Sequence, residues 1–279
     1  MDVYFISYGD KRFKKSLNRI SKEAKLTGKF SKVIKYRPED LPIFIKASPA
    51  FAFDRGGGYW LWKPYIIYKT LKEAKEGDII VYADAGCSVF ASDEWEKYFN
   101  YLESYNAIFF YYKQGFNYWG DQFDSTISGW IKKDAGEYFD RLFKNKKWRD
   151  YQKLWAGFII MKKSSNCNII EEWLKIMLFK QELLIDPYGA EINDQEELFI
   201  NHRHDQALLT PLVYFYQSRL NLLLLPENSE RRINGQALFA GRIRDKSLKK
   251  RAKLFIYDKL GKSSYNLVSK VYKYLQAEL

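Results

Sequence analysis

Short strand-like runs alternate along the chain with longer segments that have the apolar spacing of helices. The strand-like runs cover residues 3–7, 31–36, 79–82, 107–112, 157–161 and 222–225. The helix-like segments cover residues 11–26, 65–75, 93–105, 133–143 and 168–184. This repeated alternation of strand and helix predicts an α/β fold built on one sheet.

The same pattern predicts one domain with a basic helical extension. The chain has no internal repeat, low-complexity segment or clear linker, so residues 1–245 are expected to form a single domain. Residues 246–259 and 264–277 have the spacing of two terminal helices. We therefore expect residues 246–279 to form an appendix that packs on the same domain.

The composition is that of a folded protein with a large core. Of 279 residues, 47% are hydrophobic and 18% aromatic, so the chain should fold, and we expect most aromatic rings to pack in its core. The two cysteines, Cys87 and Cys167, show no CxxC spacing, which indicates a reducing compartment. Residues 1–15 lack the features of a signal peptide, so a cytoplasmic location is expected.

A formal net charge of +12 favours a polyanionic partner. Charge alone does not distinguish nucleic acid, an anionic lipid surface and a phosphorylated substrate. The basic residues between 231 and 270 are typical of a solvated or membrane-facing surface, which favours a peripheral position on the inner face of a membrane. The chain has no RNP, helix-turn-helix or zinc pattern, so we expect no nucleic-acid partner.

An acidic residue stands directly after one of the apolar runs. Asp84 follows residues 79–82 in the sequence Tyr-Ala-Asp-Ala-Gly. Ligands of open α/β sheets bind beyond the carboxyl ends of the strands, where a carboxylate contacts them directly. A carboxylate there also caps turns by accepting hydrogen bonds from backbone amides. Position alone favours neither interpretation of Asp84.

Four segments together resemble the GT-A family of nucleotide-sugar glycosyltransferases. Residues 82–86 (YADAG) resemble the family's DxD region, and residues 56–67 (GGGYWLWKPYII) are similar to bacterial transferases of the surface-polysaccharide type. Residues 155–160 (WAGFII) resemble the strand that lines the donor-sugar pocket. Residues 202–206 (HRHDQ) resemble the late Asp-Gln element of retaining enzymes such as glycogenin. The resemblance leaves the basic C-terminal tail unexplained.

The resemblance implies a GT-A-like, Rossmann-like domain with a mixed, mostly parallel sheet. It implies transfer of a hexose-type sugar from a nucleotide diphosphate sugar, foremost a UDP-sugar, to a glycan or lipid-linked acceptor, with retention of configuration. The implied catalytic residues are Lys63, Asp205 and Gln206. The implied donor-binding residues are Ser7, Tyr8, Gly9, Tyr82, Asp84, Ala85, Gly86, Ala156 and Gly157.

Several residues in these segments keep two interpretations. The faces of Trp60 and Trp62 suit the apolar surfaces of acceptor sugar rings, although core packing is the commoner use. His202 and His204 are the only histidines, and each is either a general base or a structural hydrogen-bonding residue. The glycine run at 56–58 is expected to form a flexible loop over the donor site.

Position 86 departs from the family pattern. The second carboxylate of DxD, usually the main ligand of Mn²⁺ or Mg²⁺, is replaced by Gly86. Asp84 is then the only metal ligand expected, and because one carboxylate supplies too few oxygens, use of a divalent cation is doubtful. Alternatively, basic side chains stabilise the diphosphate, and the candidates are Arg242, Arg244 and Lys246, which otherwise form a solvated face.

Other functions fit parts of the pattern. Gly86 also suits a catalytically inactive module that binds a nucleotide sugar or glycan. The net charge and the many aromatic rings suit a nucleic-acid-binding protein, which would show steeply salt-dependent binding. A nucleotidyltransferase would need a glycine-rich basic signature near the N-terminus, which this sequence lacks.

Overall fold

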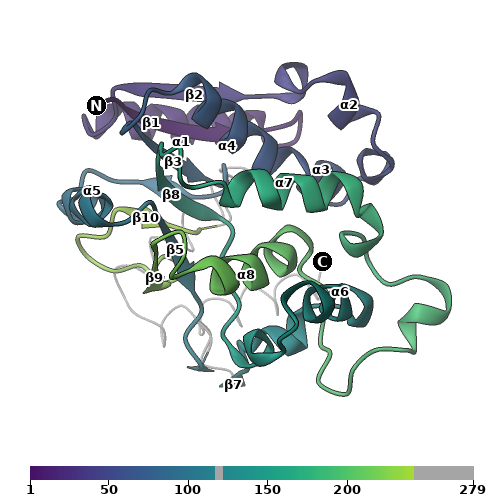
Figure 1. Ribbon diagram of the computed structural model, residues 1–279. Helices are drawn as coiled ribbons and strands as arrows, with labels where there is room; N and C mark the ends of the chain where they lie inside the picture. Colours follow the sequence, from purple (N-terminus) through teal and green to yellow (C-terminus); the bar gives the residue numbers. More distant parts are fainter. Residues whose placement is uncertain (117–121, 242–279) are drawn as a thin grey trace, which may run out of the picture. The chain divides into compact units, whose positions relative to one another are not determined.

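A six-stranded sheet organises the residues that the computed structural model describes, 1–116 and 122–241 (Figure 1). In their order across the sheet, the strands are β2 (Lys32–Tyr36), β1 (Val3–Tyr8), β3 (Ile79–Ala83), β8 (Phe158–Lys162), β5 (Ala107–Tyr111) and β9 (Leu222–Pro226). Strand β8 runs antiparallel to both neighbours, and the other pairs are parallel. The mixed, mostly parallel α/β sheet expected from the sequence is confirmed.

Helices and short strand pairs surround this sheet. The helices of the described residues are α1 (Lys14–Leu26), α2 (Ile43–Lys46), α3 (Gly56–Tyr59), α4 (Trp62–Glu73), α5 (Glu94–Ser104), α6 (Lys133–Phe143), α7 (Ile169–Phe179) and α8 (His204–Tyr216). The short strands pair as β4 (Ser88–Val89) with β10 (Leu238–Phe239) and β6 (Gly115–Phe116) with β7 (Gln122–Phe123). Figure 1 shows α4, α7 and α8 side by side, and α7 contacts both of the others.

Alternating side chains of the strands build a separate hydrophobic core on each face of the sheet. Every residue of β3 is buried. Its Val81 belongs to the core formed with α1 and α5, and its Tyr82 belongs to the core formed with α4, α7 and α8. Because successive strand residues point to opposite faces, a strand covered on both sides must be apolar throughout. Strands such as β3 are therefore visible in the sequence as continuous apolar runs.

Aromatic rings fill the core beneath α5. Trp95 is fully buried and meets Phe158 edge-on, with 5.9 Å between ring centroids. Phe158 in turn stacks on Phe110 at 4.7 Å. The indole N–H of Trp95 donates to the Phe90 carbonyl over 2.9 Å, so burial leaves it paired. The expected use of aromatic rings in core packing is confirmed for this cluster.

Helix α8 is an element that the sequence pattern does not reveal. Most of its residues are buried, so it has no polar face, and the apolar period that marks a surface helix is missing. Pro211 lies inside it, although proline usually argues against a helix interior. Packing in the tertiary structure therefore determines that this segment is helical.

Several helix boundaries also differ from the predicted ones, and the start of α1 at Lys14 instead of residue 11 is one of them. Helix α7 ends at Phe179 instead of residue 184, and a turn of 3₁₀-helix at Gln181–Leu183 follows it. Helix α4 begins at Trp62 instead of residue 65. Pro64 is tolerated because the first turn of a helix leaves backbone N–H groups without partners in any case. Lys63 consequently lies in the first turn of α4.

The glycine run forms the short turn labelled α3, whose backbone angles at Gly57 and Gly58 are not those of a right-handed helix. Gly56, Gly57 and Gly58 have φ of 60°, 60° and 91°, a left-handed conformation that residues with a Cβ rarely adopt. A Cβ at Gly58 would also lie 2.6 Å from the ring of Phe51. Glycine is therefore required at position 58 both by the backbone and by its neighbour.

The predicted extension lies outside the described residues. This applies to residues 246–279 with their two expected helices, and to the expected domain end at 245. The described residues up to Gly241 form one compact unit. Within 1–116 and 122–241, the helices fall short of the length and apolar character that a bilayer crossing requires.

Substitution Gly58→Ala should destabilise the fold more than Gly28→Ala. Gly28 also has positive φ, at 69°, but no atom lies within 4 Å of the position that an added methyl group would occupy there. We expect a loss of about 1 to 2 kcal/mol for Gly28→Ala from the backbone alone. Gly58→Ala should lose about 2 to 4 kcal/mol, because overpacking against Phe51 is added. Urea unfolding of both variants tests this, and equal losses would show that the Phe51 ring moves aside freely.

Candidate active site

The end of β3 brings Asp84 to the carboxyl edge of the sheet. The Asp84 N–H donates to the Gly157 carbonyl over 2.9 Å, and the Cys87 N–H donates to the Asp84 carbonyl over 2.9 Å. The turn after β3 is thus closed by main-chain atoms. The Ser7 hydroxyl donates to the Ala83 carbonyl over 2.7 Å, which joins the ends of β1 and β3. These contacts leave the Asp84 carboxylate partly exposed, with 38% of the side chain accessible.

Lys63 lies between two carboxylates. Its ammonium nitrogen is 2.5 Å from Asp205 Oδ2 and 3.5 Å from Asp84 Oδ1, and the residue is only 2% exposed. Burial by itself lowers the pKa of Lys63, but the two carboxylates outweigh it and raise the pKa above the usual value. Lys63 is therefore a buried cation at neutral pH. The structure brings together three of the residues that the resemblance implies.

Tyr82 and Asp205 complete this cluster. The Tyr82 hydroxyl donates to Asp84 Oδ1, and burial followed by the Asp84 charge raises the pKa of Tyr82 well above its usual range. Tyr82 is thus a permanent hydrogen-bond donor. Burial also raises the pKa of Asp205, against the opposing effect of Lys63. The Trp173 indole N–H donates to the Asp205 carbonyl over 3.0 Å and helps to hold the start of α8 in place.

Two helix N-termini meet at this cluster. Lys63 lies in the first turn of α4, and Asp205 lies in the first turn of α8. A helix N-terminus carries the equivalent of about half a positive charge, which favours carboxylates and phosphates nearby. The arrangement therefore explains why Asp84 and Asp205 are tolerated close together, and it presents positive dipole ends to an anionic ligand.

His202 has a structural role. Its Nδ1 accepts a hydrogen bond from the Lys132 N–H over 3.2 Å, so Nε2 carries the proton and donates to the Leu183 carbonyl over 3.0 Å. Burial lowers the pKa of His202 well below its usual value, so the ring is neutral. Both ring nitrogens are engaged with the main chain. Of the two interpretations that the sequence left open, the hydrogen-bonding one describes this residue.

His204 lies in a second polar cluster, next to Asp186. Its Nδ1 donates to the Leu184 carbonyl over 2.9 Å, and its Nε2 lies 3.6 Å from Asp186 Oδ1. Burial lowers the pKa of His204 to about 4, so the ring is neutral near pH 7. Its imidazole stacks on the half-buried Trp60, with 5.6 Å between centroids.

Asp186 was not among the residues selected from the sequence. It accepts a hydrogen bond from the Tyr59 hydroxyl over 3.0 Å and pairs with Arg55 over 3.2 Å. No sequence signal identifies it, because these partners lie far away along the chain. Tyr59, Trp60 and His204 all have positive φ, of 50°, 59° and 50°, which is unusual for non-glycine residues. Such strain is found preferentially at functional sites.

Tyr8 and Trp62 pack against each other. Their rings stack with 4.0 Å between centroids, and the Trp62 indole N–H donates to the Gly56 carbonyl over 2.9 Å. Both residues are buried. Trp62 thus anchors the glycine turn to the end of β1, whereas Trp60 lies beside His204.

The remaining donor-site residues lie along the same strand ends. Gly9 donates its N–H to the Tyr36 carbonyl over 3.1 Å, and a Cβ at Gly9 would lie 2.9 Å from the Cβ of Leu17. Ala156 and Gly157 lead into β8, whose first residue pairs with the last residue of β3 next to Asp84. Ala85 and Gly86 follow Asp84 along the chain. Arg19, which the sequence analysis did not select, donates to the Ala85 carbonyl over 3.0 Å.

The residues present do not fit a divalent metal ion. Within 1–116 and 122–241, no three His, Cys, Asp or Glu side chains gather as a ligand set. Asp84 and Asp205 share the Lys63 ammonium, and Gly86 offers no side-chain oxygen. Mn²⁺ and Mg²⁺ need several oxygen ligands. The alternative cations named from the sequence, Arg242, Arg244 and Lys246, lie outside the described residues.

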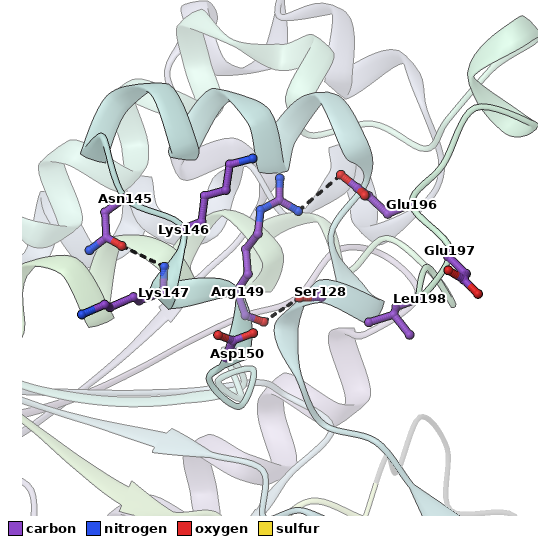
Figure 2. A pocket seen from close by; sticks show the side chains of 9 residues that line it. All are labelled: Ser128, Asn145, Lys146, Lys147, Arg149, Asp150, Glu196, Glu197 and Leu198. Carbon is purple, nitrogen blue, oxygen red and sulfur yellow. Dashed lines mark hydrogen bonds and ion pairs between the residues drawn. The ribbon is translucent and has the colours of Figure 1, made fainter.

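A cavity of about 550 Å³ lies elsewhere, and none of the predicted site residues lines it (Figure 2). Its charged lining consists of Lys146, Lys147, Arg149, Asp150, Glu196 and Glu197. Figure 2 shows Arg149 among the lining side chains, and its guanidinium pairs with Glu196 over 3.6 Å. The basic and acidic side chains balance in number, so this cavity has no charge preference for a nucleotide diphosphate.

The chain is similar to solved structures of glycosyltransferases at low identity. No protein-family model matches the sequence, and no curated protein matches it. Mouse xyloside xylosyltransferase 1 is 10% identical over 87% of this chain and 98% of that one, with a TM-score of 0.45. A glycosyltransferase involved in glycosylation of the major capsid of PBCV-1 is 8% identical over 81% and 82%, with a TM-score of 0.41. The galactosyltransferase LgtC, in complex with donor and acceptor sugar analogs, is 11% identical over 79% and 72%, with a TM-score of 0.36. Superpositions this loose say nothing about activity, which has to be argued from the side chains of the site.

Substitution Lys63→Met should destabilise the protein in a pH-dependent way. Removing the cation leaves Asp205 buried without its partner, which costs about 3 to 5 kcal/mol near pH 7. The pKa of the buried Asp205 carboxyl is higher in the folded chain than in the unfolded chain. Between these two pKa values, the folded chain therefore binds more protons than the unfolded chain. The stability of the folded chain consequently falls as pH rises through this range. The variant should therefore recover part of its stability at about pH 5.

Urea unfolding of wild type and Lys63→Met at both pH values measures this effect. The double variant Lys63→Met with Asp205→Asn is the matched control, because it has no buried carboxylate at position 205. Its stability should lose the pH dependence of the single variant. An unchanged pH dependence in the double variant would assign the effect to another group.

Proposed function

We propose that the chain is a glycosyltransferase that moves a sugar from a nucleotide diphosphate sugar, foremost a UDP-sugar, to a glycan or lipid-linked acceptor in surface-polysaccharide synthesis. The observation that carries the proposal is the contact of Lys63 with both Asp84 and Asp205 at the carboxyl edge of the sheet. Ligands of open α/β sheets bind at this edge, where the strand order changes direction. The order passes from β2 through β1 to β3, and Asp84 stands at that point.

The donor would lie across the ends of β1 and β3. The segments Ser7–Gly9 and Asp84–Gly86 form this edge and are joined by the hydrogen bond from Ser7 to the Ala83 carbonyl. Gly86 has no side chain, so a ribose or phosphate oxygen can approach the main chain closely at this position. The partly exposed Asp84 carboxylate accepts hydrogen bonds from the hydroxyls of the ribose or donor sugar.

Transfer of the sugar requires a cation and a carboxylate near its anomeric carbon. The bond from that carbon to the phosphate oxygen breaks, and its electron pair stays on the nucleotide diphosphate. The acceptor hydroxyl oxygen bonds to the anomeric carbon and passes its proton to the departing diphosphate. Lys63 and the helix N-termini stabilise the charge on the leaving group, and Asp205 stabilises the positive charge on the sugar. Retention of configuration follows from transfer on the same face.

Gln206 supplies a further contact for the ligand. Within the described part of the chain, its side-chain nitrogen is buried and has no hydrogen-bond partner. A buried amide of this kind costs free energy unless an acceptor arrives. Because Gln206 follows Asp205 in the first turn of α8, a sugar hydroxyl is a suitable acceptor. For the acceptor substrate, we assign the half-buried ring of Trp60, which stacks on His204, and the nearby Asp186, which lies 3.6 Å from His204 Nε2.

A second candidate is a module that binds a nucleotide sugar without transferring it. The observation in its favour is the engagement of both carboxylates by Lys63 together with Gly86 in place of an acidic residue. The two candidates differ in turnover and not in binding.

Substitution Asp84→Asn should abolish most of the transfer activity. The expected loss in kcat/KM is about 100-fold or more, because an isosteric amide removes the charge that orders the donor and Lys63. Purified protein is incubated with UDP-, GDP-, CDP- and dTDP-sugars, and the released nucleoside diphosphate is measured. Asp93→Asn, an exposed residue at the start of α5, is the matched control and should keep full activity.

Two outcomes would decide against transfer. Binding of a donor without any released nucleoside diphosphate, with or without acceptors, favours the inactive module. Neither binding nor turnover with any donor contradicts the whole proposal.

We also propose that the enzyme works in the cytoplasm, at the inner face of the membrane where lipid-linked acceptors are found. The support is the concentration of basic residues between 231 and 270. The full chain should co-sediment with vesicles that contain anionic lipid and remain in the supernatant with neutral vesicles. Binding should fall as salt rises. Equal recovery with both kinds of vesicle would contradict an electrostatic membrane contact.

A further inference from the structure

Two carboxylates from different elements share one buried ammonium ion. Asp84 follows β3 and Asp205 begins α8, yet both contact the Lys63 nitrogen, at 3.5 and 2.5 Å. The Tyr82 hydroxyl donates to the same Asp84 oxygen that faces Lys63. A cation is thus already present where the resemblance to metal-dependent transferases places a metal ion, and this cation is part of the chain.

A divalent ion at Asp84 Oδ1 would have to replace these contacts. Mg²⁺ approaches an oxygen ligand to about 2.0 to 2.1 Å and takes a nearly octahedral shell. Asp84 Oδ1 already accepts from Tyr82 and faces the ammonium of Lys63. An ion bound there would lie close to another positive charge in a poorly solvated place, where repulsion is strong. The described residues offer no set of acidic or histidine ligands in compensation.

The cluster is also close to electrical balance without a metal. Asp84 and Asp205 are opposed by the ammonium of Lys63, and the N-termini of α4 and α8 each add about half a positive charge. The carboxylates therefore lack the excess negative charge that draws a dication into a protein site. A lysine charge that is buried and held by two carboxylates is, by contrast, always in place.

We infer that the ammonium of Lys63 is the resident cation of the donor site, and that the chain binds its nucleotide diphosphate donor without a divalent ion. This inference rests on the proposed function. An ammonium group has three N–H donors, of which one donates to Asp205, while Asp84 lies 3.5 Å from the same nitrogen. A remaining N–H serves a phosphate oxygen of the donor, next to the two helix N-termini. Substrate binding should consequently resist chelators and depend on this lysine.

Calorimetric titration of the full chain with UDP, GDP and dTDP tests the inference without any turnover. Each nucleotide is titrated once in excess EDTA and once in excess Mn²⁺. We expect the Kd of the preferred nucleotide to agree within about twofold between the two conditions. In Lys63→Gln, the Kd in EDTA should rise by about tenfold or more, because a charged contact to phosphate is lost.

Lys69→Gln is the matched control. It removes the same charge from the same helix, α4, but Lys69 lies over the ring of Tyr36 instead of between the two carboxylates. Its nucleotide affinity should equal that of wild type. Circular dichroism of each variant verifies that it is folded.

Binding of Mn²⁺ is measured separately by electron paramagnetic resonance, and the measurement on wild type alone needs neither a nucleotide nor a variant. Wild type alone should leave the spectrum of free Mn²⁺ unchanged, and with UDP it should bind no Mn²⁺ beyond the amount that the nucleotide itself binds. If Lys63→Gln folds, it should gain Mn²⁺ binding that disappears on adding Asp84→Asn, because the two carboxylates then lack a cation.

The outcomes separate this inference from the proposed function. Nucleotide binding that occurs only with Mn²⁺, or Mn²⁺ binding to wild type that Asp84→Asn removes, overturns the resident cation and leaves the glycosyltransferase proposal standing. Equal binding in EDTA and Mn²⁺ supports the resident cation. Absence of nucleotide binding in both conditions contradicts the donor site itself, and with it the inference.

Discussion

A buried ammonium ion is the constraint on which the rest of the site depends. Lys63 is almost completely shielded from water, and an unpaired charge in such a place would cost several kcal/mol, about 3 to 5 by comparison with broken buried ion pairs. Carboxylates therefore have to neutralise the Lys63 charge, and Asp84 and Asp205 do so from elements that are far apart in the chain. One set of charges ties the carboxyl end of β3 to the N-termini of α4 and α8.

The chain on either side of this cluster is held in unusual conformations. Tyr59, Trp60 and His204 adopt left-handed backbone angles. Tyr59 and Trp60 lie just before α4, which carries Lys63, and His204 is the first residue of α8, which carries Asp205. Such angles persist only where surrounding contacts hold them. Here the rings of Tyr59 and Trp60 pack on His204, and Asp186 accepts the Tyr59 hydroxyl. The strain is thus compensated by the contacts that set the direction of α4 and α8 toward the site.

Two of the buried lysines among the described residues, Lys132 and Lys63, have different roles. Lys132 pairs with Asp134 over 3.1 Å and donates to the Glu182 carbonyl over 2.5 Å, so it fastens one loop to another. Lys63 instead contacts two carboxylates at the carboxyl edge of the sheet, where ligands of open α/β sheets bind. This location at the sheet edge is the reason for placing function at Lys63.

The sequence by itself determined the sheet and the position of Asp84. Strands covered on both faces must be apolar throughout, so β1, β3 and β5 are legible as runs, and a charged residue directly after such a run has to lie at the sheet edge. Only the tertiary structure decided α8, which is buried too completely to show a helical period, and the roles of His202 and Asp186. It also decided that one lysine neutralises both carboxylates, because contacts between residues 63, 84 and 205 depend on how the elements pack and leave no local pattern along the chain.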